Sequence, residues 1–227
     1  MAEEKQTQGS GEVIIRGFTG GPFAQNGYLV TCARSKKGLL IDPGGATPEM
    51  LAAVRDEGIE VEAIVLTHAH LDHVDGVARA KRETGAPVLL HVADEPLYHA
   101  APRQAEMFGV PFDPAPPVDR HLSHGDTVRF GDCSFEVRFT PGHAPGHVIL
   151  VGDGVAIVGD CVFMGSIGRT DLPGGDFQTL MRSIREQILT LPEETVLYSG
   201  HGPETTVGHE RVSNPFLVPD YGGSRFA

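Results

Sequence analysis

A short polar segment after an apolar run constrains this chain more than any other feature. Residues Ala63–Leu66 are typical of a buried strand, and His68, His70, Asp72 and His73 follow within seven positions. In an extended chain alternate side chains point the same way, so His68 and His70 can face one position. Asp72 and His73, at the turn into a helix, can serve a second position. Neutral imidazole and carboxylate groups suit zinc, iron or manganese, so the segment predicts a metal site.

Three more candidate ligands follow other apolar runs, each beside glycine or proline. They are His143, Asp160 and His201. Taken singly, each is more typical of a turn than of a ligand. Together with the first segment they make five histidines and two aspartates, enough for two ions.

The overall composition narrows the classes of partner. The chain has 227 residues, and its 18 basic against 30 acidic side chains give a net charge of −12, which argues against nucleic-acid binding. No apolar run approaches the roughly 18 residues of a membrane span, and the acidic start is unlike a secretory signal. Three scattered cysteines fit reduced thiols. We therefore expect a cytoplasmic protein that binds neither membrane nor nucleic acid.

The order of apolar periods predicts one domain over residues 12–217, between a disordered polar tail at 1–11 and a C-terminal tail at 218–227. Strands are predicted at 13–15, 28–31, 38–41, 63–66, 87–92, 127–130, 134–140, 147–151, 155–158 and 195–198. Helices are predicted at 47–58, 74–83 and 177–191, the last capped by Asp176. This pattern favours an α/β fold in which two sheets stack face to face with helices outside.

The motifs resemble those of the metallo-β-lactamase-fold hydrolases. The resemblance lies in His-x-His-x-Asp-His at 68–73, Gly-His at 142–143, Gly-Asp at 159–160 and Gly-His at 200–201. Segments 42–45, 168–176 and 214–217 resemble short bacterial proteins of the glyoxalase II type, which are hydroxyacylglutathione hydrolases. The resemblance implies a four-layer αββα sandwich with metals at one edge between the sheets.

The resemblance also implies a ligand set for two divalent ions, with zinc expected and iron or manganese as alternatives. One ion is implied on His68, His70 and His143; the other is implied on Asp72, His73 and His201, with Asp160 bridging both. Asp72 and Asp160 are thereby implied as catalytic residues. Asp42, before Pro-Gly-Gly, is interpreted as orienting a ligand histidine, although a plain turn-former is the competing interpretation.

Two such ions would lower the pKa of a shared water to about 7 and supply the nucleophile, a bridging hydroxide. The resemblance thus implies hydrolysis of a small acyl thioester, as glyoxalase II converts S-lactoylglutathione into lactate and glutathione. Candidate substrate contacts are Arg169, Asp171, Phe23 and Asn26. Arg169 is equally compatible with pinning its own loop. Oligomeric state is left open.

Other functions stay open at this stage. A persulfide dioxygenase would use one iron on His68, His143 and Asp160, but that family typically has cysteine where this chain has His147. Lactone or β-lactam hydrolysis could use the same site, and a metal-binding module without activity is a further alternative. The remaining histidines are interpreted as structural: His91 in a strand, His121 and His124 in a turn, His99 and His209 on helices.

Overall fold

The computed structural model describes residues 7–8 and 13–218. The tails expected at 1–11 and 218–227 lie outside these residues, apart from Thr7–Gln8 and Val218. Thr7–Gln8 form strand β1, which pairs antiparallel with β2 (Val13–Gly20).

Two sheets contain most of the strands in the described residues. The first has the order β1-β2-β3-β4-β5-β6-β7, and the second β15-β14-β11-β10-β9-β8. The further strands of the first sheet are β3 (Gln25–Cys32), β4 (Lys37–Ile41), β5 (Glu60–Val65), β6 (Val88–His91) and β7 (Arg120–Leu122). Those of the second are β8 (Thr127–Phe130), β9 (Cys133–Phe139), β10 (Val148–Gly152), β11 (Val155–Gly159), β14 (Val196–Ser199) and β15 (Thr205–Thr206). A separate hairpin joins β12 (Val162–Phe163) and β13 (Ser166–Ile167).

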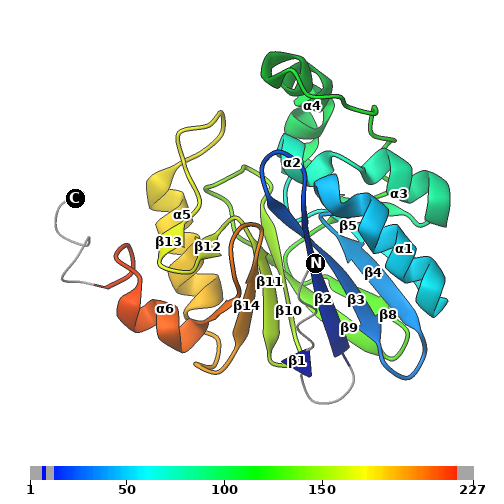
Figure 1. The fold of residues 1–227 in the computed structure, drawn as a ribbon. Helices are drawn as coiled ribbons and strands as arrows, with labels where there is room; N and C mark the ends of the chain where they lie inside the picture. The colour runs from blue at the N-terminus through cyan, green and yellow to red at the C-terminus, as the bar shows by residue number, and fades with distance from the viewer. Residues whose placement is uncertain (1–6, 9–12, 219–227) are drawn as a thin grey trace.

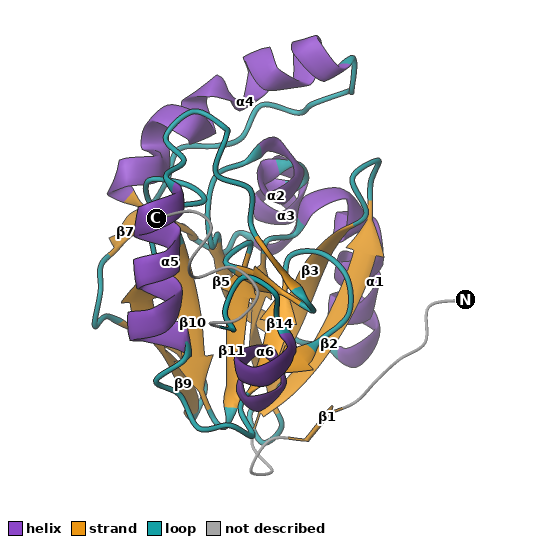
Figure 2. Cartoon of the chain, turned by 90° about the vertical axis from the view of Figure 1, so that its left-hand side faces the viewer, coloured by secondary structure: helices purple, strands orange, loops and turns teal. Residues whose placement is uncertain are grey.

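Helices cover the outer face of each sheet, as Figures 1 and 2 show. The first sheet carries α1 (Thr47–Glu57), α2 (Leu71–Val74), α3 (Val77–Thr84) and α4 (Glu95–Phe108). The second carries α5 (Phe177–Ser183), its π-helical continuation η3 (Ile184–Ile188), and α6 (Val207–Ser213). This arrangement confirms the αββα sandwich.

Side chains along the central strands point alternately toward the inner core and toward the helices, which explains why these strands are continuous apolar runs in the sequence. In β3, Tyr28 and Val30 face the core between the sheets, whereas Leu29 packs toward the helices. In β10, Leu150 faces the same inner core and Ile149 faces α5. A strand covered on both faces buries both sets of side chains, so neither face is polar.

The carboxyl ends of several strands meet at one edge of the sandwich. In the first sheet β4, β5 and β6 are parallel, and in the second β9, β11 and β14 run in one direction. Backbone hydrogen bonds join the two edges: Val148 N donates to Thr67 O, and Asn26 N donates to Gly200 O, both at 2.8 Å. Loops from both sheets therefore converge on one place.

Three elements differ from the sequence predictions. The helix predicted at 74–83 is observed as α3, which begins only at Val77, and the separate short helix α2 ends at Val74, because Gly76 adopts a φ of 92° and packs against Gly44 and Thr47. No bounds were predicted for α4, although His99 inside it was placed on a helix; Pro102, also inside it, interrupts the helical pattern. His121 lies in the edge strand β7 instead of a turn, since polar residues are tolerated on an exposed edge.

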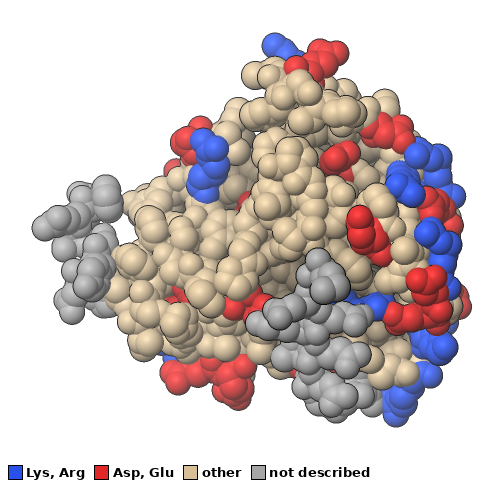
Figure 3. Space-filling view, in the orientation of Figure 1, with Lys and Arg blue, Asp and Glu red and all other residues tan. Residues whose placement is uncertain are grey.

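The surface mixes charges of both signs. Figure 3 shows basic side chains beside acidic ones along the edge formed by α1 and α3, where Arg55 and Arg79 both pair with Glu83. Among the described residues, no helix combines the length and the apolar character that crossing a bilayer requires.

Candidate metal centre

The segment after β5 places four ligand candidates in two directions. His68 and His70 lie in the extended loop, with φ and ψ of −69° and 152° at His70, and α2 then carries Asp72 and His73. The short helix α2 turns Asp72 and His73 away from the line of the loop. One segment of the first sheet thus contributes to two clusters of side chains.

The second sheet supplies the remaining candidates. His143 lies in the loop between β9 and β10, Asp160 directly follows β11, and His201 lies two residues after β14. Gly200 allows the last two loops to approach, since a Cβ there would lie 2.1 Å from Asp160 Oδ1. A side chain at this position would force the loops apart.

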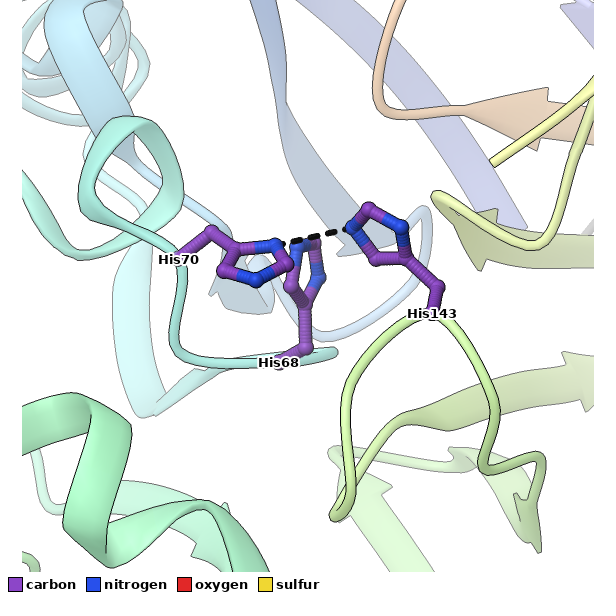
Figure 4. Close-up of side chains that lie close together, drawn as sticks. All are labelled: His68, His70 and His143. Atoms are coloured by element: carbon purple, nitrogen blue, oxygen red, sulfur yellow. Dashed lines mark hydrogen bonds between the residues drawn. The ribbon is translucent and has the colours of Figure 1, made fainter. Parts of the chain in front are cut away.

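The first cluster contains only histidines. One ring nitrogen each from His68, His70 and His143 lies within 4.8 Å of the others, and Nδ1 of His70 is 2.8 Å from Nε2 of His143. Figure 4 shows the three rings converging from two different loops. Three imidazoles in this arrangement are a common ligand set for a divalent ion.

The second cluster combines carboxylate with imidazole. Nε2 of His201 is 3.1 Å from Asp72 Oδ2, and Nε2 of His73 is 3.8 Å from the same oxygen. Asp160 lies between the clusters: its oxygens are 3.5 Å from His143 Nε2 and 3.4 Å from His73 Nε2. The structure thus brings all seven predicted ligands together and places Asp160 where it can touch both sites.

Buried atoms without partners test whether a metal fits these residues. Nε2 of His68, His70 and His73 and Oδ1 of Asp160 are buried and have no hydrogen-bond partner. Leaving such groups unsatisfied costs about 1–3 kcal/mol each, so native proteins rarely do so without a reason. Divalent ions in the two clusters would supply the missing partners, and the donor set fits zinc, iron or manganese.

The pKa shifts of the site residues also favour a bound metal. Burial lowers the pKa of His70 to about 3 and holds the pKa of His68 well below its ordinary value, so both rings are neutral. Burial also opposes the charged forms of His73 and Asp160, but their mutual attraction outweighs it. The pKa of His73 is raised and that of Asp160 lowered. The first cluster thus offers the neutral imidazoles of His68 and His70, while the carboxylates around His73 attract positive charge.

Asp42 holds the ligand segment from behind. Its Oδ1 accepts from Thr67 N at 2.7 Å, and its Oδ2 accepts from Thr67 Oγ1 at 2.6 Å and lies 3.0 Å from His73 Nδ1. The same carboxylate also lies close enough to His68 and His73 to form a third potential ligand group. Because both of its oxygens are already engaged, it serves to orient His73. Thr67 was not recognised from the sequence; its position directly before His68 was the available signal.

His147 supports the centre without belonging to either cluster. Its Nε2 accepts from the backbone N–H of Asp160 at 3.1 Å, and its ring stacks on that of His68 with centroids 5.0 Å apart. Thr140 Oγ1 lies 2.9 Å from the other ring nitrogen. This imidazole therefore holds the Asp160 backbone in place.

The candidate substrate residues fall into different settings. Arg169 and Asp171 are exposed and form a bidentate ion pair at 2.7 Å, while the backbone oxygen of Arg169 lies 2.7 Å from His143 Nδ1. Phe23 is exposed beside Asp72 and makes an edge-to-face contact with Phe108, with centroids 5.6 Å apart. The backbone of Arg169 thus contacts the His143 ring, Asp171 pairs with the Arg169 side chain, and Phe23 lines a pocket together with Asp72.

Asn26 is buried and is engaged with the loop that carries His201. Its amide nitrogen donates to Ser199 O at 3.0 Å and to Gly202 O at 2.8 Å. Its Oδ1 accepts from Thr19 Oγ1 at 2.6 Å. Both amide protons are therefore committed to the protein, and contact with a substrate remains a prediction.

The family model described as "Metallo-beta-lactamase superfamily" matches residues 20–201, from the end of β2 through His201. The chain belongs to the metallo-β-lactamase superfamily. The matched range contains both clusters and Asp160. Membership and the His/Asp clusters together make the protein a metal-dependent hydrolase.

Similar proteins within the superfamily are of nearly the same length. The chain is 37% identical to hydroxyacylglutathione hydrolase GloC of Haemophilus influenzae, over 86% of this chain and 93% of that one. It is similar to the crystal structure of BLEG-1 B3 metallo-β-lactamase, with a TM-score of 0.84, 37% identity and coverage of 90% and 99%. It is also similar to TTHA1623 in a di-iron-bound form, with a TM-score of 0.80, 42% identity and coverage of 88% and 99%.

Proposed function

We propose that this metallo-β-lactamase superfamily member hydrolyses small acyl thioesters, with S-lactoylglutathione as the model substrate. The observation that carries the proposal is the pair of adjoining clusters with Asp160 between them. The similarity to GloC, whose name states hydroxyacylglutathione hydrolysis, supports the substrate class. Two bound divalent ions would activate water and polarise the substrate carbonyl.

The ligand residues fall into two groups, one for each ion. His68, His70 and His143 would hold one ion; Asp72, His73 and His201 would hold the other. Asp160 is buried and its pKa is lowered, because the charges of His73 and His143 outweigh the effect of burial. It stays ionised at neutral pH and can bind both ions.

The leaving group decides between kinds of acyl substrate. The pKa of Asp72 is lowered because His73 and His201 outweigh the effect of burial, so neither Asp72 nor Asp160 holds a proton to donate at neutral pH. An amine or an alkoxide leaves poorly without a proton donor, whereas a thiolate leaves unprotonated. The ionised state of Asp72 and Asp160 therefore supports a thioester substrate.

An assay with matched substrates tests the proposal. We expect metal-loaded protein to release thiol from S-lactoylglutathione, detected with a thiol-specific dye, and chelator-treated protein to release none. A lactate ester in which oxygen replaces the thioester sulfur, with a leaving group of the same length, is expected to be hydrolysed more slowly. Failure to hydrolyse a panel of glutathione and coenzyme A thioesters, with both ions bound, would reject the proposal.

A second candidate, β-lactam hydrolysis, is favoured by the similarity to BLEG-1. Its amide leaving group needs protonation, so we expect a chromogenic cephalosporin to be a poorer substrate than the thioester. A larger kcat/KM for the cephalosporin would reverse this order and assign the protein to β-lactam hydrolysis.

A further inference from the structure

A buried carboxylate outside the ligand set joins the two loops of the three-histidine cluster. Asp94 ends the short 3-10 turn η2 (Val92–Asp94), after β6 and before α4, and is fully buried. It occupies the N-cap position of α4, where aspartate ordinarily accepts a hydrogen bond from its own helix. Here it makes no such bond. Its carboxylate is turned to other partners.

Those partners are backbone N–H groups in loops from different sheets. Asp94 Oδ2 accepts from Ala69 N at 2.9 Å, and Asp94 Oδ1 accepts from Gly146 N. Ala69 lies between His68 and His70, and Gly146 lies three residues after His143. One carboxylate therefore links the segments that carry all three histidines of the first cluster.

The approach of the second loop depends on Gly146. A Cβ at this position would lie 2.6 Å from Asp94 N and 2.9 Å from Asp94 Cβ, closer than atoms can pack. The His143 loop can thus reach Asp94 only with glycine there. The contact between the two loops therefore depends on both Asp94 and Gly146.

The second cluster is held by other residues. Asp42 lies against His73, and Asn26 donates to the backbone on both sides of His201. No hydrogen bond recorded for the described residues connects Asp94 to Asp72, His73 or His201. Asp94 therefore contacts only the loops of the first cluster, whereas Asp42 reaches both clusters, through Thr67 beside His68 and through His73.

We infer that Asp94 is a positioning residue for one of the two metal sites: it fixes the spacing between the His68–His70 loop and the His143 loop. Both carboxylate oxygens are needed, because two backbone N–H donors from two loops must be accepted by one fully buried side chain. The inference rests on the two-metal centre, not on the identity of the substrate.

The test measures metal affinity, which does not require turnover. In Asp94→Asn the amide keeps one acceptor, but its NH2 group faces the second backbone N–H. We expect competition with a chromophoric chelator to show one of the two zinc ions bound about 10–100-fold more weakly, the range seen when groups behind metal ligands are lost. The other ion should keep its wild-type affinity. The visible spectrum of the cobalt form should change for the weakened site alone.

Asp119→Asn is the matched control. Asp119 also accepts a backbone N–H beside β6, from Val88 at 2.7 Å, but at the opposite end of the strand. The Asp119→Asn variant should be less stable than wild type, but its affinity for one ion should not fall relative to its affinity for the other. Circular dichroism and the apo-protein Tm establish that each variant folds.

Three outcomes are decisive. Selective weakening of one ion in Asp94→Asn, absent in Asp119→Asn, supports the inference. Wild-type affinity for both ions, or equal weakening of both, overturns it and leaves Asp94 a structural residue. If wild-type protein itself binds only one ion, the two-metal centre fails first, which separates that failure from this one.

Discussion

Replacing Asp160 with asparagine is expected to lower kcat about a thousandfold or more while the protein stays folded. Asparagine has nearly the same size, so the packing around it is kept. It loses the negative charge, and one carboxylate oxygen becomes an NH2 group that cannot bind a cation. Loss of a group behind a ligand costs about 10–100-fold, and loss of a ligand shared by two ions should cost more.

The position of Asp160 explains the size of this effect. Its oxygens lie 3.4–3.6 Å from ring nitrogens of His73, His143 and His201, which belong to both clusters. Steady-state kinetics on S-lactoylglutathione and metal content should be measured together. Asp56→Asn, on the exposed face near the end of α1, is the matched control and should retain full activity. Near-wild-type kcat in Asp160→Asn would mean that Asp160 is not shared between metals.

Complete removal of metal is expected to lower the Tm by at least about 10 °C. A ligand present at a thousand times its Kd stabilises the folded state by about 4 kcal/mol per site, and each kcal/mol shifts the Tm of a domain of this size by about 2–4 °C. Without ions, buried nitrogens of His68 and His73 lack partners, and the carboxylates of Asp72 and Asp160 both lie against His201 Nε2, at 3.1 and 3.6 Å. Differential scanning calorimetry before and after chelation measures the shift.

Zinc added back should restore both the Tm and the activity, whereas magnesium, which prefers oxygen ligands, should restore neither. An unchanged Tm after verified removal of all metal would show that the ions contribute nothing to holding the two sheets together. Restoration by magnesium would contradict the histidine-rich ligand set.

The strand ends could be predicted because the residues that mark them are neighbours in the sequence. His143, Asp160 and His201 each come soon after an apolar run and stand beside glycine, so a strand followed by a turn could be recognised at these three positions. The order of strand and helix patterns favoured two stacked sheets, and the resemblance implied the four-layer sandwich. Where Pro102 interrupts the helical pattern, the sequence placed His99 on a helix but did not give the bounds of α4.

The supports of the site were harder to predict because they are contacts over long stretches of sequence. Asp94 is 25 residues from Ala69 and 52 from Gly146, and no local pattern connects them. Asn26 was interpreted as a substrate contact, which stays a prediction; the structure adds that it donates to Ser199 O in β14 and to Gly202 O in the loop that follows. This role in holding a loop could be recognised only from the assembled sheets.

The most direct test of the account is the number of ions per chain. Protein purified without oxygen or chelator should be measured by inductively coupled plasma mass spectrometry against an accurate protein concentration. The two clusters predict close to two divalent ions per chain, whether zinc, iron or manganese. One ion per chain, all of it iron, would contradict the binuclear centre and favour the single-iron persulfide dioxygenase.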